Sequence, residues 1–207
     1  MEDRGRRAAR VTGAGLVLNA GLTTGKYLAG FLGHSGAMVA DATHSLSDLI
    51  TDVVVLLGFR IVQKPSDRSH DFGHGKVETL LALLCGLFLL AAGVGICWNA
   101  LWSLDRVYRG EALQAPEFVA LGAAVVSVIS KELLYWYTRY WGEKLSSSAL
   151  VAKAWDHRSD AFSSIGTTLG IGGAILLGER GRVLDPLAAL VVSVFVVKVS
   201  LPMIRES

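Results

Sequence analysis

The sequence VETLLALLCGLFLLAAGVGICWNALWSL, residues 77–104, decides the fold. It is longer than the roughly 20 apolar residues that a helix needs to cross a bilayer. Five similar apolar stretches lie at 11–32, 37–62, 118–140, 149–177 and 184–204. Because a bilayer core offers no water to backbone amides, runs of this length favour helices over the shorter alternating strands of a barrel. We therefore predict an all-α membrane protein with six transmembrane helices.

The composition of the chain agrees with a membrane protein. Of its 207 residues, 52% are apolar and 18% charged, and the mean hydropathy is +0.46, which is too apolar for an ordinary soluble domain. Six spans take roughly 120 residues, so little remains for a second domain. We expect a cytoplasmic N-terminal segment at 1–10, one transmembrane domain at 11–204 and no C-terminal cytoplasmic domain.

Charge and cysteine content exclude several classes of function. A net charge of +2 is too small for a nucleic-acid partner, which requires a basic face. Cys85 and Cys97 lie far apart in one apolar run, so neither a disulfide nor a thiolate zinc site is expected. The Gly-His-Gly-Lys stretch at 73–76 lacks the spacing of a phosphate loop, and we expect no organic cofactor.

The distribution of lysine and arginine predicts the orientation of the chain. Eleven of these residues lie in the segments on the side of the N-terminus, against four on the other side. By the positive-inside rule, both termini are predicted to be cytoplasmic. The expected location is the cytoplasmic membrane of a bacterium, in which the chain is a multi-pass integral protein.

Two of the predicted spans contain charged residues that a bilayer disfavours. Span 37–62 contains Asp41, His44, Asp48 and Asp52. At 100 degrees per residue these four lie within an arc of about 80 degrees on one helix face. Asp156 and Asp160 lie one turn apart in span 149–177. An aspartate at mid-membrane costs about 2.5–3.5 kcal/mol, so these carboxylates need a common partner.

We predict that this partner is a divalent cation in the bundle interior. Its four ligands are predicted to be His44, Asp48, Asp156 and Asp160. One imidazole and three carboxylates suit zinc, and they also suit iron(II), manganese(II) or cadmium(II).

Ion pairing or helix capping is the alternative explanation for some of these acids. Asp41 and Asp52 can each cap a helix end or pair with a lysine of a span. The lysines considered are Lys26, Lys131 and Lys198. Arg158 can neutralise Asp156 in the same way. We therefore assign only an accessory role to Asp41, Asp52 and the neighbouring His157.

A second group of ligand-type side chains lies in the loop after the second predicted span. It contains Asp67, His70, Asp71 and His74. Imidazole and carboxylate at spacings of three and four residues can hold a metal, so Asp67, His70 and His74 form a candidate loop site. Solvated loop histidines without a metal are the alternative.

Three segments together resemble the cation diffusion facilitator family of divalent-metal transporters. They are DATHSLSD at 41–48, DRSHDFGHGK at 67–76 and AWDHRSDAFSS at 154–164. The resemblance implies a six-helix protomer, a homodimer and proton-coupled export. It places the transport ligands at His44, Asp48, Asp156 and Asp160. It places the loop ligands at Asp67, His70 and His74.

The chain departs from the family pattern at two points. Many zinc-transporting members have histidine at the position of Asp156, whereas His157 is one residue late and points about 100 degrees away. Zinc is nevertheless the first expected substrate. Most members continue into a cytoplasmic C-terminal domain, whereas this sequence ends at Ser207. We therefore expect a dimer that depends on the membrane helices and on the loop around Lys76.

We expect alternating access, in which metal binds from the cytoplasm and protons replace it. His44 is the leading proton carrier, because an imidazole changes charge near neutral pH, and Asp48 shares this role. An organic-cation transporter is disfavoured because no aromatic residue lies between Asp41 and Asp52. An intramembrane aspartyl hydrolase lacks its second motif, so we expect no enzyme. The remaining alternative is a non-transporting scaffold or partner subunit with a structural metal site.

Overall fold

A computed structural model describes residues 2–62 and 75–205, with side chains at 6–53, 80 and 83–205. Its elements are α1 (Glu2–Leu32), α2 (Gly36–Val62), α3 (Gly75–Tyr108), α4 (Phe118–Lys144), α5 (Ser148–Leu176), the 3-10 turn η1 (Gly178–Arg180) and α6 (Leu184–Arg205). The prediction of an all-α chain with six helices is confirmed for these residues. The helices α2 to α6 begin and end within four residues of the predicted spans, whereas α1 begins nine residues before its apolar run.

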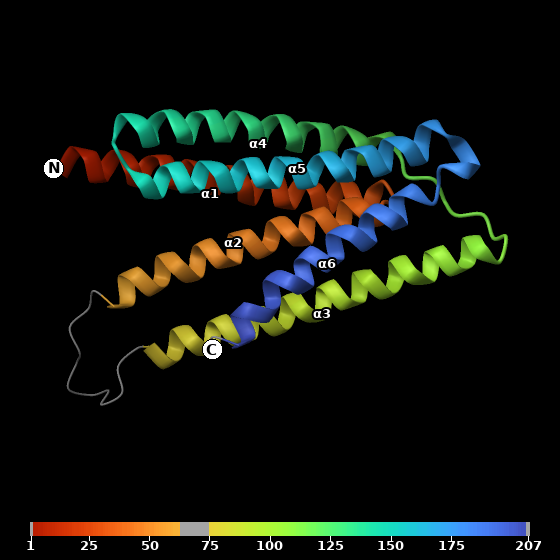
Figure 1. Ribbon diagram of the computed structural model, residues 1–207, viewed down its shortest axis with the longest axis horizontal. Helices are drawn as coiled ribbons and strands as arrows, with labels where there is room; N and C mark the ends of the chain where they lie inside the picture. The colour runs from red at the N-terminus through yellow and green to blue at the C-terminus, as the bar shows by residue number, and fades with distance from the viewer. Residues whose placement is uncertain (1, 63–74, 206–207) are drawn as a thin grey trace.

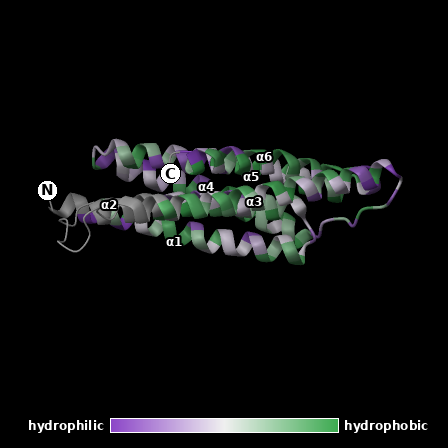
Figure 2. Cartoon of the chain, turned by 90° about the horizontal axis from the view of Figure 1, so that it is seen from below, coloured by the Kyte–Doolittle hydropathy of each residue, from purple (hydrophilic) through white to green (hydrophobic). Residues whose placement is uncertain are grey.

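The outer surface of the bundle is apolar. Large hydrophobic side chains are exposed on all six helices, and much of the buried interior consists of alanine and polar residues. Figure 2 shows hydrophobic residues along most of the helical surface. Among the residues that the structure describes, three segments are long and apolar enough to cross a membrane, namely Leu83–Tyr108, Phe118–Lys144 and Gly178–Arg205. Buried polar or charged side chains lie on α1, α2 and α5, and also on α4 and α6.

The six helices form two layers. One layer contains α1, α4 and α5, and the other contains α2, α3 and α6 (Figure 1). Within the layers, α4 packs along α5, and α3 packs along α6. The N-terminus and the connection from α4 to α5 lie at one end of the bundle, where α2 and α5 diverge (Figure 1). The candidate site lies between α2 and α5, so the divergence of these two helices determines how far apart its residues are.

Glycines allow close helix packing within each layer. A Cβ atom on Gly142 of α4 would lie 2.9 Å from a methyl group of Val151 on α5. A Cβ atom on Gly93 of α3 would lie 3.0 Å from a methyl group of Val197 on α6. Small residues at these crossings let the backbones approach without a side chain between them, as is common in membrane helices.

The first turn of α2 is attached to α6 at the opposite end of the bundle. Ser35 caps α2, since its hydroxyl accepts a hydrogen bond from the Met38 amide at 3.1 Å. Asp185 of α6 accepts a hydrogen bond from the Gly36 amide at 2.8 Å and another from the Ser35 hydroxyl. Carboxylates stabilise helix N-termini, where backbone amides lack partners. This junction sets the position of α2, which carries two of the candidate ligands.

Candidate metal centre

Three of the four predicted ligands lie together between the layers. His44 and Asp48 are on successive turns of α2, and Asp160 is on α5. Each offers one ligand atom, and these atoms all lie within 4.8 Å of one another. The three side chains are half-buried, and this is the one such group of histidine, cysteine and acidic residues among the described side chains. One imidazole nitrogen and two carboxylate oxygens at this separation have the chemistry of a transition-metal site.

Two atoms of this cluster are buried without a hydrogen-bond partner. They are Nδ1 of His44 and Oδ2 of Asp48, considering the residues that the structure describes. Buried polar side chains nearly always have a partner, because an unsatisfied buried group is costly. Unpaired polar atoms on two members of a cluster of ligand-type residues are typical of a site that binds a ligand.

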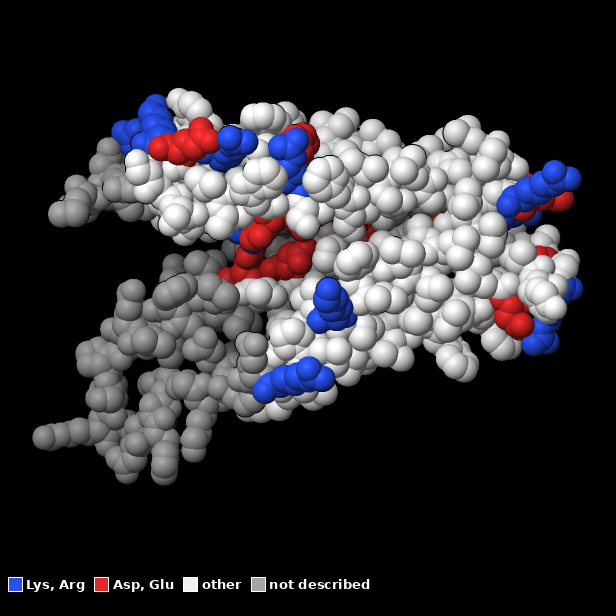
Figure 3. Space-filling view, viewed as in Figure 1, with Lys and Arg blue, Asp and Glu red and all other residues white. Residues whose placement is uncertain are grey.

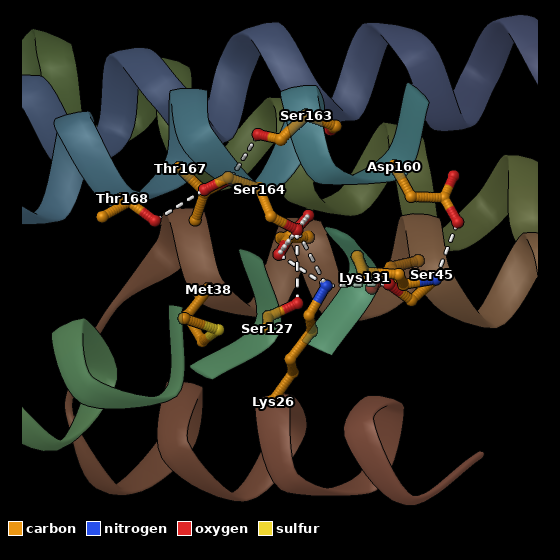
Figure 4. Close-up of polar contacts among 12 residues, drawn as sticks. Lys26, Met38, Ser45, Ser127, Lys131, Asp160, Ser163, Ser164, Thr167 and Thr168 are labelled. Atoms are coloured by element: carbon orange, nitrogen blue, oxygen red, sulfur yellow. Dashed lines mark hydrogen bonds and ion pairs between the residues drawn. The ribbon is translucent and has the colours of Figure 1, made fainter. Parts of the chain in front are cut away.

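The third member of the cluster, Asp160, has a lysine as its partner. Nζ of Lys131, on α4, lies 2.7 Å from Oδ2 of Asp160. The lysine side chain is 1% exposed and the aspartate 14%. Figure 4 shows the two side chains and the interaction between them. One carboxylate of the candidate centre is therefore already neutralised by a buried ammonium group.

Asp156, the fourth predicted ligand, does not join the cluster. Its side chain is 67% exposed, and its carboxylate lies 3.8 Å from Nζ of Lys153. It precedes Asp160 by one helical turn, toward the end of the bundle where α4 connects to α5. Arg158 does not neutralise it, since that guanidinium lies 3.7 Å from Glu132 and stacks over the ring of Tyr135. Asp156 thus lies outside the three-residue cluster, on the more accessible side.

Asp41 forms a buried ion pair away from the cluster. Its carboxylate lies 2.8 Å from Nζ of Lys26, and both side chains are at most 2% exposed. The same ammonium group donates hydrogen bonds to the hydroxyls of Ser45 and Ser164, at 2.9 and 3.1 Å. Figure 4 shows this network of α1, α2 and α5, with Ser127 of α4 beside it. For Asp41, the structure thus has the ion pair that the sequence left open as the alternative.

Asp52 and His157 also lie outside the cluster. Asp52 pairs with Lys153 of α5, a lysine that the sequence interpretation did not consider. His157 is 2% exposed and turns toward α1, where it lines a cavity with Asn19 and Thr138. Its position on the α1 side of the bundle agrees with its offset of about 100 degrees from Asp156. The predicted loop site at Asp67, His70 and His74 lies outside the described residues.

Open space adjoins the cluster on two sides. Figure 3 shows acidic side chains in a hollow between the two layers, where α2 and α5 diverge. A cavity of about 610 Å³ borders His44 and Ser163 and is otherwise lined mainly by apolar side chains of α5 and α6. The cluster therefore has room beside its ligands for an ion and for water.

Sequence reasoning did not assign the three lysines to their partners. Each of Lys26, Lys131 and Lys153 pairs with an aspartate of another helix. A lysine inside an apolar run, such as Lys131 in span 118–140, does indicate from the sequence that an acidic partner is needed. The choice of partner depends on how the helices pack, which a single-helix pattern does not specify.

Comparisons with known proteins support one family. The family model for the cation efflux transmembrane domain matches residues 14–207. The chain is 40% identical over 209 residues to metal tolerance protein C1 of Arabidopsis thaliana, covering 95% of this chain and 44% of that protein. It is 34% identical over 209 residues to the manganese efflux system protein MneP of Bacillus subtilis, covering 99% and 69%. It spans about half the length of the plant relatives that it matches.

An apolar-surfaced helical bundle with ligand-type side chains between its layers defines an integral membrane protein with a candidate metal centre. The chain belongs to the cation efflux family, the cation diffusion facilitators, which is a family of transporters. The family predicted from the three sequence segments is thereby confirmed.

Proposed function

We propose that this protein exports a divalent transition-metal ion from the cytoplasm in exchange for protons. The observation that supports the site is the convergence of His44, Asp48 and Asp160, whose ligand atoms lie within 4.8 Å of one another. Buried atoms of His44 and Asp48 have no other partner among the described residues. Relatives named as metal tolerance and manganese efflux proteins support the class of substrate.

The proposed metals are zinc and manganese. A centre with one nitrogen and two oxygen donors suits zinc, which tolerates mixed ligands and three protein ligands with a water. The predominance of carboxylate oxygen also suits manganese, a harder ion, and two Bacillus subtilis relatives are named for manganese efflux. Iron(II) and cadmium(II) are weaker candidates with the same ligands.

We assign the end of the bundle that holds the N-terminus to the cytoplasm, following the positive-inside rule. The metal then enters through the hollow between the layers (Figure 3). It first meets Asp156, which is the most exposed of the four predicted ligands. It passes to His44, Asp48 and Asp160, and protonation of His44 and Asp48 accompanies its release to the other side. A homodimer, in which each protomer carries one such centre, belongs to the same proposal.

Uptake into reconstituted vesicles tests this function. With the purified protein in liposomes of acidic lumen, zinc or manganese is expected to accumulate while protons leave. A protonophore that collapses the gradient should stop accumulation, and protein-free vesicles serve as the control. Metal binding without any flux would instead support a scaffold with a structural metal site. Competition among zinc, manganese, iron and cadmium then identifies the preferred ion.

Metal affinity is expected to fall as the pH falls. A nitrogen or carboxylate oxygen that carries a proton cannot bind a cation, so protons and metal compete for the same ligands. Titration calorimetry at about pH 7.5 and about pH 5.5 should show affinity that is about tenfold or more lower at the acidic pH. Equal affinities at the two pH values would remove proton competition from the mechanism.

Replacement of Asp156 by asparagine is expected to weaken transport only moderately. Because this carboxylate is exposed and outside the cluster, its loss should lower metal affinity by about tenfold or less, without a change in thermal stability. The measurement is metal uptake as a function of metal concentration. A loss as large as that of a cluster ligand would mean that Asp156 joins the ligands in another conformation.

A further inference from the structure

Lys131 places a positive charge inside the candidate metal centre. Its ammonium group comes from α4, a helix that supplies no candidate ligand, and it lies 2.7 Å from Oδ2 of Asp160. At 1% exposure the charge is shielded from solvent. Asp160 is its one hydrogen-bond partner among the described residues. The carboxylate that is to bind the metal is therefore held by a lysine of the protein itself.

The other buried lysine of the interior is arranged differently. Lys26 contacts Asp41 and also donates to two serine hydroxyls, so its charge is satisfied by a network of its own. Asp41 is not part of the ligand cluster. Lys131 alone, of the lysines that the structure describes, has its ammonium group on a member of the cluster.

A metal ion in the cluster and the ammonium group of Lys131 must compete. A metal bound to Asp160 lies about 2 Å from one of its oxygens, which leaves the two cations a few ångströms apart if the lysine stays in place. Repulsion between charges is strong where solvent is excluded. Metal binding therefore requires the lysine to move away, or it proceeds against the repulsion, and in both cases the lysine lowers the affinity.

We propose that Lys131 is an internal counter-cation of the metal centre. It holds Asp160 while the centre is empty, yields this carboxylate to the arriving metal, and takes it back when the metal leaves. This exchange keeps a buried carboxylate neutralised at each stage and prevents the metal from binding too tightly to be released. The inference rests on the proposed function, because it assigns a regulator of affinity to the same site.

Substitution of Lys131 tests the counter-cation role. In Lys131→Met the charge is removed, and calorimetry of the purified protein with zinc and with manganese should show binding at least about tenfold tighter than in the wild type. Lys131→Arg keeps the charge and should bind within about threefold of the wild type. In liposomes, Lys131→Met should show a lower half-saturating metal concentration together with a lower maximal rate, because release becomes slow.

A structural role alone predicts a different result. If Lys131 only neutralises Asp160 for stability, Lys131→Met lowers the melting temperature but does not tighten metal binding. Unchanged or weaker binding in the folded variant would overturn the proposal. Should Lys131→Met not fold, Lys131→Gln, whose amide can still donate to Asp160 without a charge, should show the same tightening. If Lys131→Gln does not bind metal more tightly than the wild type, the proposal is overturned as well.

A matched control separates this inference from the proposed function. Lys144→Met removes an exposed lysine at the end of α4, whose ammonium group contacts Tyr140 and Trp141 and no member of the cluster, and should leave affinity within about threefold of the wild type. If the wild type neither binds nor transports metal, the proposed function fails. If the wild type does both and Lys131→Met does not bind more tightly, only the counter-cation role fails.

Discussion

Replacing Asp48 by asparagine is expected to abolish metal transport while the protein remains folded. The amide has nearly the same shape as the carboxylate but no charge, so the centre loses one of its two clustered carboxylates. Because Oδ2 of Asp48 has no partner among the described residues, the substitution leaves no other polar group unsatisfied. We expect metal affinity to fall by about 100-fold or more. This loss is larger than that expected for a residue that only holds a metal ligand in position, which is about 10- to 100-fold.

The measurement pairs metal uptake by liposomes with a melting curve of the purified protein in detergent. Asp105→Asn is the matched control, since this aspartate pairs with Arg109 at the exposed end of α3, far along the chain from the cluster. It should transport like the wild type. Transport by Asp48→Asn at the wild-type rate would show that the ion does not pass through this cluster.

Replacing Lys26 by methionine is expected to have the largest effect on stability. The Lys26–Asp41 pair is almost completely buried, and the lysine also donates to Ser45 and Ser164. Removal of one partner from a buried pair leaves an uncompensated charge and typically costs about 3–5 kcal/mol. We expect a much lower melting temperature in detergent and poor recovery of the folded protein.

A double variant distinguishes charge burial from loss of packing. When both members of a buried ion pair are replaced by apolar residues, stability is often kept. Lys26→Met combined with Asp41→Leu should therefore recover most of the melting temperature that the single variant loses. A double variant as unstable as the single one would mean that the serine contacts, and not the unpaired carboxylate, dominate.

The positions of the helices could be predicted from the sequence because each span is a long, mainly apolar run. The extra length of α1 could not, since residues 2–10 are polar and only their helix-forming alanines and arginines favour continuation. The two-layer arrangement could not be predicted from the sequence either. It depends on close crossings such as Gly142 against Val151, and a single-sequence pattern does not show which helices meet.

Part of the candidate site could be predicted from the spacing of its residues along each helix. Helical spacing places His44 and Asp48 on one face of α2, and the structure brings Asp160 to that face. Spacing also groups Asp156 with Asp160, yet the first is exposed and the second is mostly buried. Side chains on successive turns of a helix point in a similar direction but can differ in burial. Here the divergence of α2 and α5 determines how deeply each side chain is buried between the layers.

The arrangement of the buried ion pairs bears on how the chain enters the membrane during synthesis. Lys26 and Asp41 lie on the consecutive helices α1 and α2, and Lys131 and Asp160 lie on the consecutive helices α4 and α5. A single helix leaving the translocon with an unpaired charge faces a penalty that a neighbour of opposite charge offsets. Each of these two hairpins carries its own neutralising partner, so integration in pairs of helices avoids exposing a lone charge to lipid.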